Sequence, residues 1–189
     1  MPRRLRKLPP GSVVHVVNRG NDKRLLFGRA AEFEDFLQLV LWAKGQCPVQ
    51  ILAYCIMGNH WHFVFWVQHA GDVSRFLHRL TSTHARSWRR RTATIGCGHV
   101  YQDRFHDSKV FTETHYFNVM RYVEQNPRRA NLVRRSQDWR WSSLAERLGS
   151  DRGILDAGPA ALPIDWPQVV DESLPDESIE EIRSALQRY

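Results

Sequence analysis

The chain has 189 residues and carries 27 Lys and Arg against 20 Asp and Glu, which gives a formal net charge of +7. This length suits one domain with its own hydrophobic core. No apolar run approaches the roughly 20 residues of a membrane-spanning helix, so we expect no membrane partner. The three cysteines, Cys47, Cys55 and Cys97, fit neither a disulfide framework nor a zinc ribbon. The N-terminal stretch MPRRLRKLPP lacks the apolar core of a signal peptide. These two observations predict a cytoplasmic protein with reduced thiols.

Charge is distributed unevenly along the chain. Residues 151–189 hold three basic and nine acidic side chains, which leaves 24 and 11 for residues 1–150. The body of the chain therefore has a charge of +13 and its C-terminal part −6. A body this basic indicates a polyanionic partner, although many soluble proteins are basic without binding nucleic acid.

Hydrophobic periodicity predicts strands and helices in the order β-α-β-β-α-β-α. The expected strands cover residues 12–18, 49–56, 60–67 and about 105–111, and the expected helices 30–44, 71–90 and about 115–126. Met57-Gly58-Asn59 is a tight connection, so the second and third strands read as a hairpin. This order is typical of the ferredoxin-like split βαβ fold, an α+β class with an antiparallel sheet. Both helices between the strands cover one face, and the last helix is expected to dock beside the other.

Two histidines share one face of the third predicted strand. In YCIMGNHWHFVFW, His60 and His62 stand two residues apart, and successive side chains of a strand point to opposite faces. Both imidazoles therefore project together, with Trp61 and Phe63 on the other side. Such a pair provides two metal ligands on a rigid element. Two unrelated histidines on a half-exposed strand would give the same pattern.

A tyrosine and an asparagine lie together on the last predicted helix, within HYFNVMRYVEQNPRRANLV. Tyr122 flanks the apolar stripe, and Asn126 follows one turn later on the same flank. Pro127 disfavours helical geometry in the residue before it, so we expect the helix to end at about Asn126. The pair is compatible with a boundary tyrosine and a helix-end asparagine. Alternatively, the amide completes a metal site with the histidines while the phenolate attacks a phosphodiester.

Taken together, these motifs resemble the single-tyrosine HUH transposases. They are similar in particular to the REP-associated tyrosine transposases, relatives of the transposases of small insertion sequences. The motifs occur in order as HVVNRG, MGN followed by HWH, GHVYQDRFHDSKV, and YVEQN followed by PRRANLV, with WRWSS further on. The resemblance runs from about Val13 to about Leu148. Gly58 stands where the family commonly has proline, a loop substitution that touches no ligand.

The resemblance and the residue chemistry lead to one mechanistic hypothesis. A single Mg²⁺ or Mn²⁺ is held by His60, His62 and the side-chain oxygen of Asn126, and it polarises a phosphate that Tyr122 attacks. The oxygen ligand and the phosphodiester substrate favour these ions over zinc. The resemblance implies a 5′-phosphotyrosine intermediate and strand transfer without ATP. It also implies a DNA partner, single-stranded or in hairpins of repetitive extragenic palindromes (REP), and so a nucleoid-associated location.

Two further residues near the tyrosine have open roles. Gln125 is an alternative metal ligand, less well aligned with Tyr122 than Asn126 is. His115 lies seven residues before Tyr122 and could assist proton transfer, although a surface histidine also fits.

Arginines and tryptophans supply the candidate DNA contacts. Arginine binds phosphate oxygens in a fork, and aromatic rings stack on unpaired bases. The candidates are Arg75, Arg79, Arg86, Arg89 and Arg90 on the second helix, Arg4 in a basic arm, Arg128 and Arg129 beside the tyrosine, and Trp88 and Trp141. A solvated basic face and core packing of the tryptophans are the alternatives.

The chain is expected to divide into a transposase domain over residues 1–148 and a loop-rich tail over residues 149–189. The tail contains a short amphipathic helix at about 175–187, which either packs as an appendage or covers a basic DNA groove. Monomer and homodimer both remain open. Two rival functions are a domesticated hairpin-binding protein without cleavage activity, and a phosphoesterase that uses the histidines with water as the nucleophile.

Overall fold

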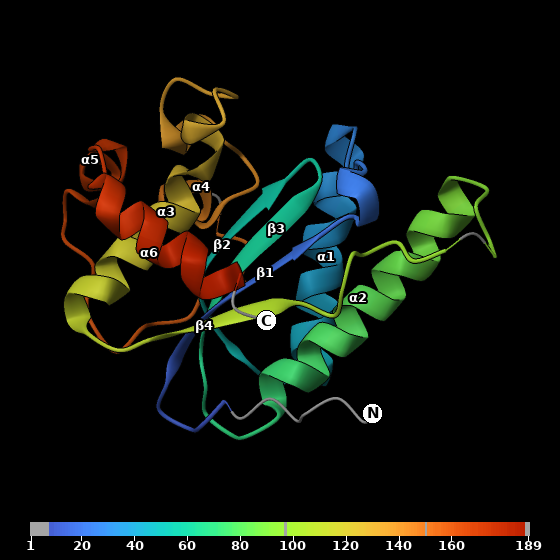
Figure 1. The fold of residues 1–189 in the computed structure, drawn as a ribbon, viewed down its shortest axis with the longest axis horizontal. Coiled ribbons are helices and arrows are strands. Elements are labelled where there is room, and N and C mark those ends of the chain that lie inside the picture. The colour runs from blue at the N-terminus through green and yellow to red at the C-terminus, as the bar shows by residue number, and fades with distance from the viewer. Residues whose placement is uncertain (1–7, 97, 150, 188–189) are drawn as a thin grey trace.

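The protein is described by a computed structural model over residues 8–96, 98–149 and 151–187. Its centre is a four-stranded antiparallel sheet in the order β2-β3-β1-β4. The strands are β1 (Val13–Arg19), β2 (Gln50–Met57), β3 (His60–Trp66) and β4 (His106–Val110). Helices lie on both faces of this sheet (Figure 1). The element order and the antiparallel sheet confirm the predicted ferredoxin-like α+β fold.

Two long helices cover one face of the sheet (Figure 1). They are α1 (Ala30–Gln46) and α2 (Asp72–Arg91), both close to their predicted limits. Their apolar stripes bury Phe36, Leu37 and Val40 of α1 and Phe76, Leu77 and Leu80 of α2 against the strand residues Trp61, Phe63 and Phe65. Each such side chain contributes roughly 1.5–3 kcal/mol when it leaves water. This face is therefore the main hydrophobic core.

The opposite face of the sheet is covered by the helix that carries Tyr122 and by the C-terminal helices. These are α3 (Glu113–Arg129), α4 (Ser143–Arg147), α5 (Trp166–Asp171) and α6 (Asp176–Gln187). Elsewhere in the described residues, 3-10 turns lie at Asn21–Lys23 and Ser136–Asp138. Val119 and Val123 of α3 pack against Cys55 of β2 and Val64 of β3 in a second apolar cluster. The helix α6 lies over β4 (Figure 1).

The helix α3 ends later than the sequence predicts. The expected end at Asn126 was wrong, because α3 continues through Pro127 to Arg129. A proline removes one helical N–H donor. The helix nevertheless continues past the proline, since Ala130 N donates to the carbonyl of Asn126 at 3.0 Å, and it is closed by Leu132 N, which donates to the carbonyl of Pro127 at 2.9 Å. Pro127 is buried, so its packing offsets the lost bond.

The C-terminal segment packs on the body of the protein. The amphipathic helix expected at about 175–187 is α6, whose Ile182 is 1% exposed. Trp166 and Val170 of α5 are buried in the same apolar cluster as α3. The proposed division at residue 148 remains a prediction. None of the helices in the described part of the chain combines the length and the apolar character needed to cross a bilayer.

Candidate functional site

Side chains from β1, β3 and α3 meet on the sheet face that α3 covers. Strand alternation sends Trp61 and Phe63 into the main core, as predicted, and turns His60 and His62 towards α3. The ring centroids of His60 and His62 are 5.1 Å apart. The ring of Tyr122 lies 5.9 Å from that of His62, in an edge-on arrangement. The structure therefore brings together three of the residues that the sequence analysis selected.

Asn126 completes this group. Its Nδ2 donates to the backbone carbonyl of Tyr122 at 3.3 Å. Burial is the main cause that lowers the pKa of His60, to about 4; Arg19 contributes, and the neighbouring Asn126 opposes the shift. Since Nδ2 of Asn126 is directed at the carbonyl of Tyr122, its amide oxygen is the atom left to face His60. The Nδ1 of His60 lies 2.7 Å from Oδ1 of Asn59, which orients the ring.

A third histidine, His15, lies beside His62 and was not among the predicted site residues. Its Nε2 lies 2.9 Å from Nδ1 of His62, and the two rings stack with centroids 5.1 Å apart. Burial is the main cause that lowers the pKa of His15, to about 3, and that of His62 to well below its usual value. Both imidazoles are thus neutral at neutral pH. The signal was present in HVVNRG, where His15 interrupts a run of valines in a strand.

Tyr122 is almost enclosed, with 7% of its surface exposed. The guanidinium carbon of Arg129 lies 5.0 Å from the centre of its ring. Burial lowers the pKa of Arg129, and the neighbouring Tyr122 opposes this shift. A permanent cation is therefore held against the ring of Tyr122.

The two residues after Val123 hold α3 in place. Glu124 is fully buried, and its carboxylate accepts from Trp166 Nε1 at 2.6 Å, from Arg147 Nε at 3.1 Å and from Ser143 Oγ. Gln125 donates to the backbone carbonyls of Val170 and Glu172 at 2.9 and 2.8 Å. Its side chain is directed at the C-terminal segment, so Asn126 is the better placed ligand candidate.

The donor set suits a divalent cation. Within residues 8–96, 98–149 and 151–187, no cluster of three His, Cys, Asp or Glu side chains is placed to hold a metal. Two imidazoles and one amide oxygen do converge, however, through His60, His62 and Asn126. Because burial keeps the imidazoles neutral, their lone pairs are available for coordination. These residues could hold Mg²⁺ or Mn²⁺ and leave coordination positions for a phosphate.

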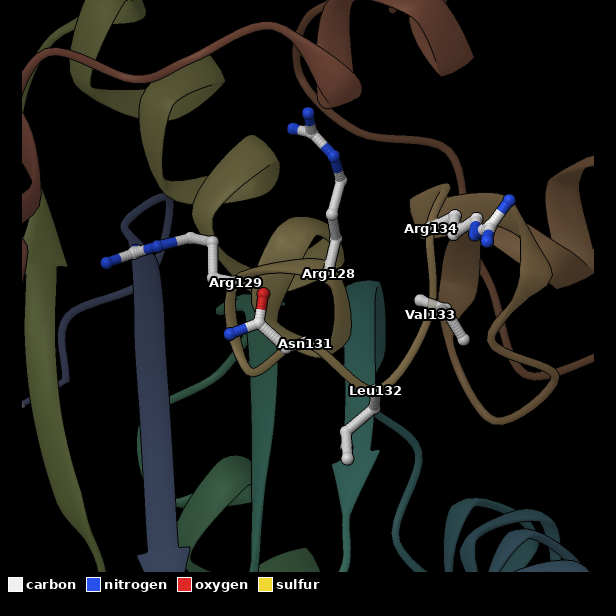
Figure 2. Close-up of a pocket in the computed structure, with 6 residues that line it drawn as sticks. All are labelled: Arg128, Arg129, Asn131, Leu132, Val133 and Arg134. Carbon is white, nitrogen blue, oxygen red and sulfur yellow. The ribbon is translucent and has the colours of Figure 1, made fainter.

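A basic hollow adjoins the tyrosine at the end of α3. Its volume is about 630 Å³, and its lining residues are Arg128, Arg129, Asn131, Leu132, Val133 and Arg134. Figure 2 shows Arg129 and Arg134 extending in opposite directions, with Arg128 between them. Arg128 donates to the carbonyl of Asp171 at 2.6 Å. Arg129 thus links the hollow to the phenol of Tyr122.

The other predicted phosphate contacts lie elsewhere. The helix α2 packs on the sheet face opposite Tyr122, so its arginines are separated from the tyrosine by the sheet. Arg75, Arg79, Arg86 and Arg90 are exposed, and Arg89 donates to the carbonyl of Gly98. Arg4 lies outside the described residues.

The two tryptophans that were predicted to stack on DNA bases pack against protein side chains. Trp88 is 8% exposed and belongs to the main core, and its Nε1 donates to the carbonyl of Leu25 at 3.3 Å. Trp141 stacks on Phe33 with ring centroids 4.1 Å apart and donates to Glu34 at 3.1 Å. The structure favours the core-packing alternative for both rings.

Comparison with known proteins bears on the fold and the family of the chain. No curated protein sequence matches the chain significantly. Among solved structures, the chain is similar to a REP-associated tyrosine transposase bound to a REP hairpin, with a TM-score of 0.61 and 18% identity over 87% of this chain and 95% of that chain. This likeness confirms the fold. Residues 11–126 match the family of IS200-like transposases. The chain therefore belongs to the IS200-like transposase family.

Proposed function

We propose that this transposase is a metal-dependent single-strand DNA nuclease and strand transferase that uses Tyr122 as its nucleophile. One observation carries the proposal. The phenol of Tyr122 lies on the same sheet face as His60, His62 and the amide oxygen of Asn126. A protein that only binds DNA has no need to bring a buried phenol and two neutral imidazoles together.

The phenol oxygen attacks the phosphorus of a DNA phosphodiester. A bond forms between Tyr122 Oη and phosphorus while the bond from phosphorus to the 3′ oxygen breaks. The 5′ phosphate stays on the tyrosine, and the leaving oxygen takes a proton to become a free 3′-hydroxyl. Because the phosphotyrosine is itself a phosphodiester, attack by another 3′-hydroxyl reverses the step and joins DNA without ATP.

The residues around Tyr122 have different roles in the reaction. His60, His62 and Asn126 would hold a divalent cation, which would supply charge to polarise the scissile phosphate. Arg129 places its positive charge beside the attacking phenol. The enclosure of Tyr122 excludes water, which would otherwise compete with the incoming 3′-hydroxyl.

Hairpin DNA of the REP type is the proposed substrate. The solved structure to which this chain is similar was bound to a REP hairpin. The hollow lined by Arg128, Arg129 and Arg134 is basic, and forked guanidinium groups suit phosphate oxygens. Such a substrate would locate the protein with the nucleoid in the cytoplasm.

The test uses hairpin oligonucleotides labelled at the 5′ or the 3′ end, with Mn²⁺ or Mg²⁺. The wild-type protein is compared with Tyr122→Phe and His60→Ala on a denaturing gel. We expect the 3′-terminal fragment to stay bound to the protein after denaturation, and this band to vanish in both variants and with chelator. Exposed Arg140→Ala, whose guanidinium lies 3.8 Å from Glu34 of α1, is the matched control and should cleave as the wild type does.

Two outcomes would favour the rival functions. Cleavage that persists in Tyr122→Phe would indicate a phosphoesterase in which water is the nucleophile. Tight hairpin binding without cleavage by the wild-type protein, with either metal, would indicate a domesticated binding protein.

A further inference from the structure

A third buried histidine lies behind the proposed metal ligands. His15 on β1 is fully buried and His62 on β3 is 4% exposed. The antiparallel register pairs Val17 with His62 and His15 with Val64, so the two imidazoles are diagonal neighbours on one face. Their approach, with Nε2 of His15 2.9 Å from Nδ1 of His62, is that of a hydrogen bond.

A hydrogen bond between two neutral imidazoles fixes which nitrogens carry protons. One ring must donate and the other must accept, and each neutral ring carries a single N–H. If His62 donates from Nδ1, its Nε2 keeps a lone pair. If His62 accepts at Nδ1, its proton sits on Nε2 and blocks metal binding there. Only the first arrangement makes His62 a ligand through Nε2.

We propose that His15 is a positioning residue that accepts a hydrogen bond from Nδ1–H of His62 and so presents Nε2 of His62 to the cation. This inference rests on the proposed metal-dependent function and deepens it. Metal-binding histidines are commonly oriented by such a partner on the second nitrogen, and loss of the partner weakens metal binding about 10–100-fold.

The other nitrogen of His15 supports a specific role for this ring. Its Nδ1 is buried, and no hydrogen-bond partner for it is present among the described residues. An unpaired buried polar atom costs roughly 1–3 kcal/mol. The neighbouring positions on this face, Val13 and Val17, are valines, and another valine would fill the strand position without that cost. The bond to His62 offsets this cost, whereas an apolar side chain could not orient an imidazole.

The test measures Mn²⁺ affinity by electron paramagnetic resonance in the wild type, His15→Phe and His15→Gln. Phenylalanine fills the space but accepts no hydrogen bond, so we expect the dissociation constant to rise about 10–100-fold. The amide oxygen of glutamine accepts in place of Nε2, so His15→Gln should recover most of the affinity. The matched control is His84→Phe, which removes a buried histidine from the opposite face of the sheet and should leave Mn²⁺ affinity unchanged.

A second measurement reads the tautomer directly, without any variant. In ¹⁵N-labelled wild-type protein with Mg²⁺, long-range ¹H–¹⁵N correlation spectra should place the proton of His62 on Nδ1. A proton on Nε2 would overturn the inference even if His15→Phe fails to fold.

The remaining outcomes separate this inference from the proposed function. Unchanged Mn²⁺ affinity in folded His15→Phe would overturn the role of His15 alone. Three coordinated imidazoles in pulsed resonance spectra of the wild type would also overturn it, because His15 would then be a ligand. Absence of Mn²⁺ binding to the wild-type protein would overturn the metal dependence itself, and the inference with it.

Discussion

The guanidinium carbon of Arg129 lies 5.0 Å from the centre of the Tyr122 ring. The two residues are seven positions apart, which is about two turns of helix. The contact therefore depends on α3 continuing past Pro127 to Arg129. A helix that ended at Asn126 would have left the arginine on a loop.

We first predict that Arg129→Ala slows formation of the covalent complex by roughly 100-fold, because it removes the positive charge that lies beside the attacking phenol. Arg129→Lys keeps the charge and should recover part of the rate. Single-turnover cleavage at saturating hairpin DNA measures the effect. Equal rates for Arg129→Ala and wild type would show that the arginine serves only to cover the ring.

Replacement of Asn126 tests its amide oxygen as a ligand. Asn126→Asp keeps an oxygen and adds a negative charge, so Mn²⁺ should bind at least as tightly as in the wild type. Asn126→Leu removes the oxygen at similar volume, and we expect affinity to fall at least tenfold. Titration calorimetry measures the Mn²⁺ affinity of both variants. Gln125→Leu serves as the comparison, because Gln125 bonds the C-terminal segment and should affect stability rather than affinity.

The arginines of α2 remain predicted phosphate contacts on the face away from Tyr122. If they touch hairpin DNA, replacing both Arg79 and Arg86 with alanine should weaken binding and reduce the slope of log affinity against log salt by about 1.4–1.8. Fluorescence anisotropy at several salt concentrations measures this slope. An unchanged slope would instead assign these exposed side chains to a solvated surface.

Glu124 provides a prediction for stability. Its carboxylate is fully buried between Arg147, Ser143 and Trp166. Glu124→Ala leaves these donors without their acceptor, so we expect a loss of about 3–5 kcal/mol in the free energy of unfolding. Urea denaturation followed by circular dichroism gives the value. Exposed Glu181→Gln on α6 is the control and should change stability by less than about 0.5 kcal/mol.

Stability should also fall in acid because of His84. Burial lowers its pKa to about 3, with a contribution from Arg91, while the unfolded residue has a pKa near 6.5. Between these values the unfolded chain binds a proton that the folded chain does not. This histidine therefore stabilises the fold above pH 6.5, and its contribution declines towards pH 3 by up to about 1.4 kcal/mol per pH unit.

The check is urea unfolding at pH 6.5, 5.5 and 4.5. His84→Gln should show a shallower dependence on pH than the wild type, and exposed His69→Gln should not. Parallel curves for wild type and His84→Gln would contradict the assignment.

Much of the fold followed from local patterns. Strand alternation has a period of two residues and helical stripes a period of 3.6, so the order of elements and the shared face of His60 and His62 could be predicted. The pairing of Tyr122 with Asn126 was also local, because residues four apart are neighbours on a helix. Where a prediction failed, at the end of α3, buried packing of Pro127 outweighed the local preference against helix.

The sequence by itself determined which side chains share a face of one strand or one helix. Only the tertiary structure decided which of those faces meet. His15 and His62 are separated by 47 positions, and their contact depends on the register between β1 and β3. The packing of Trp141 on Phe33 likewise joins distant segments. Register and packing depend on how whole apolar surfaces fit together. Because that fit produces no periodic pattern in a short stretch of sequence, these contacts could not be predicted from it.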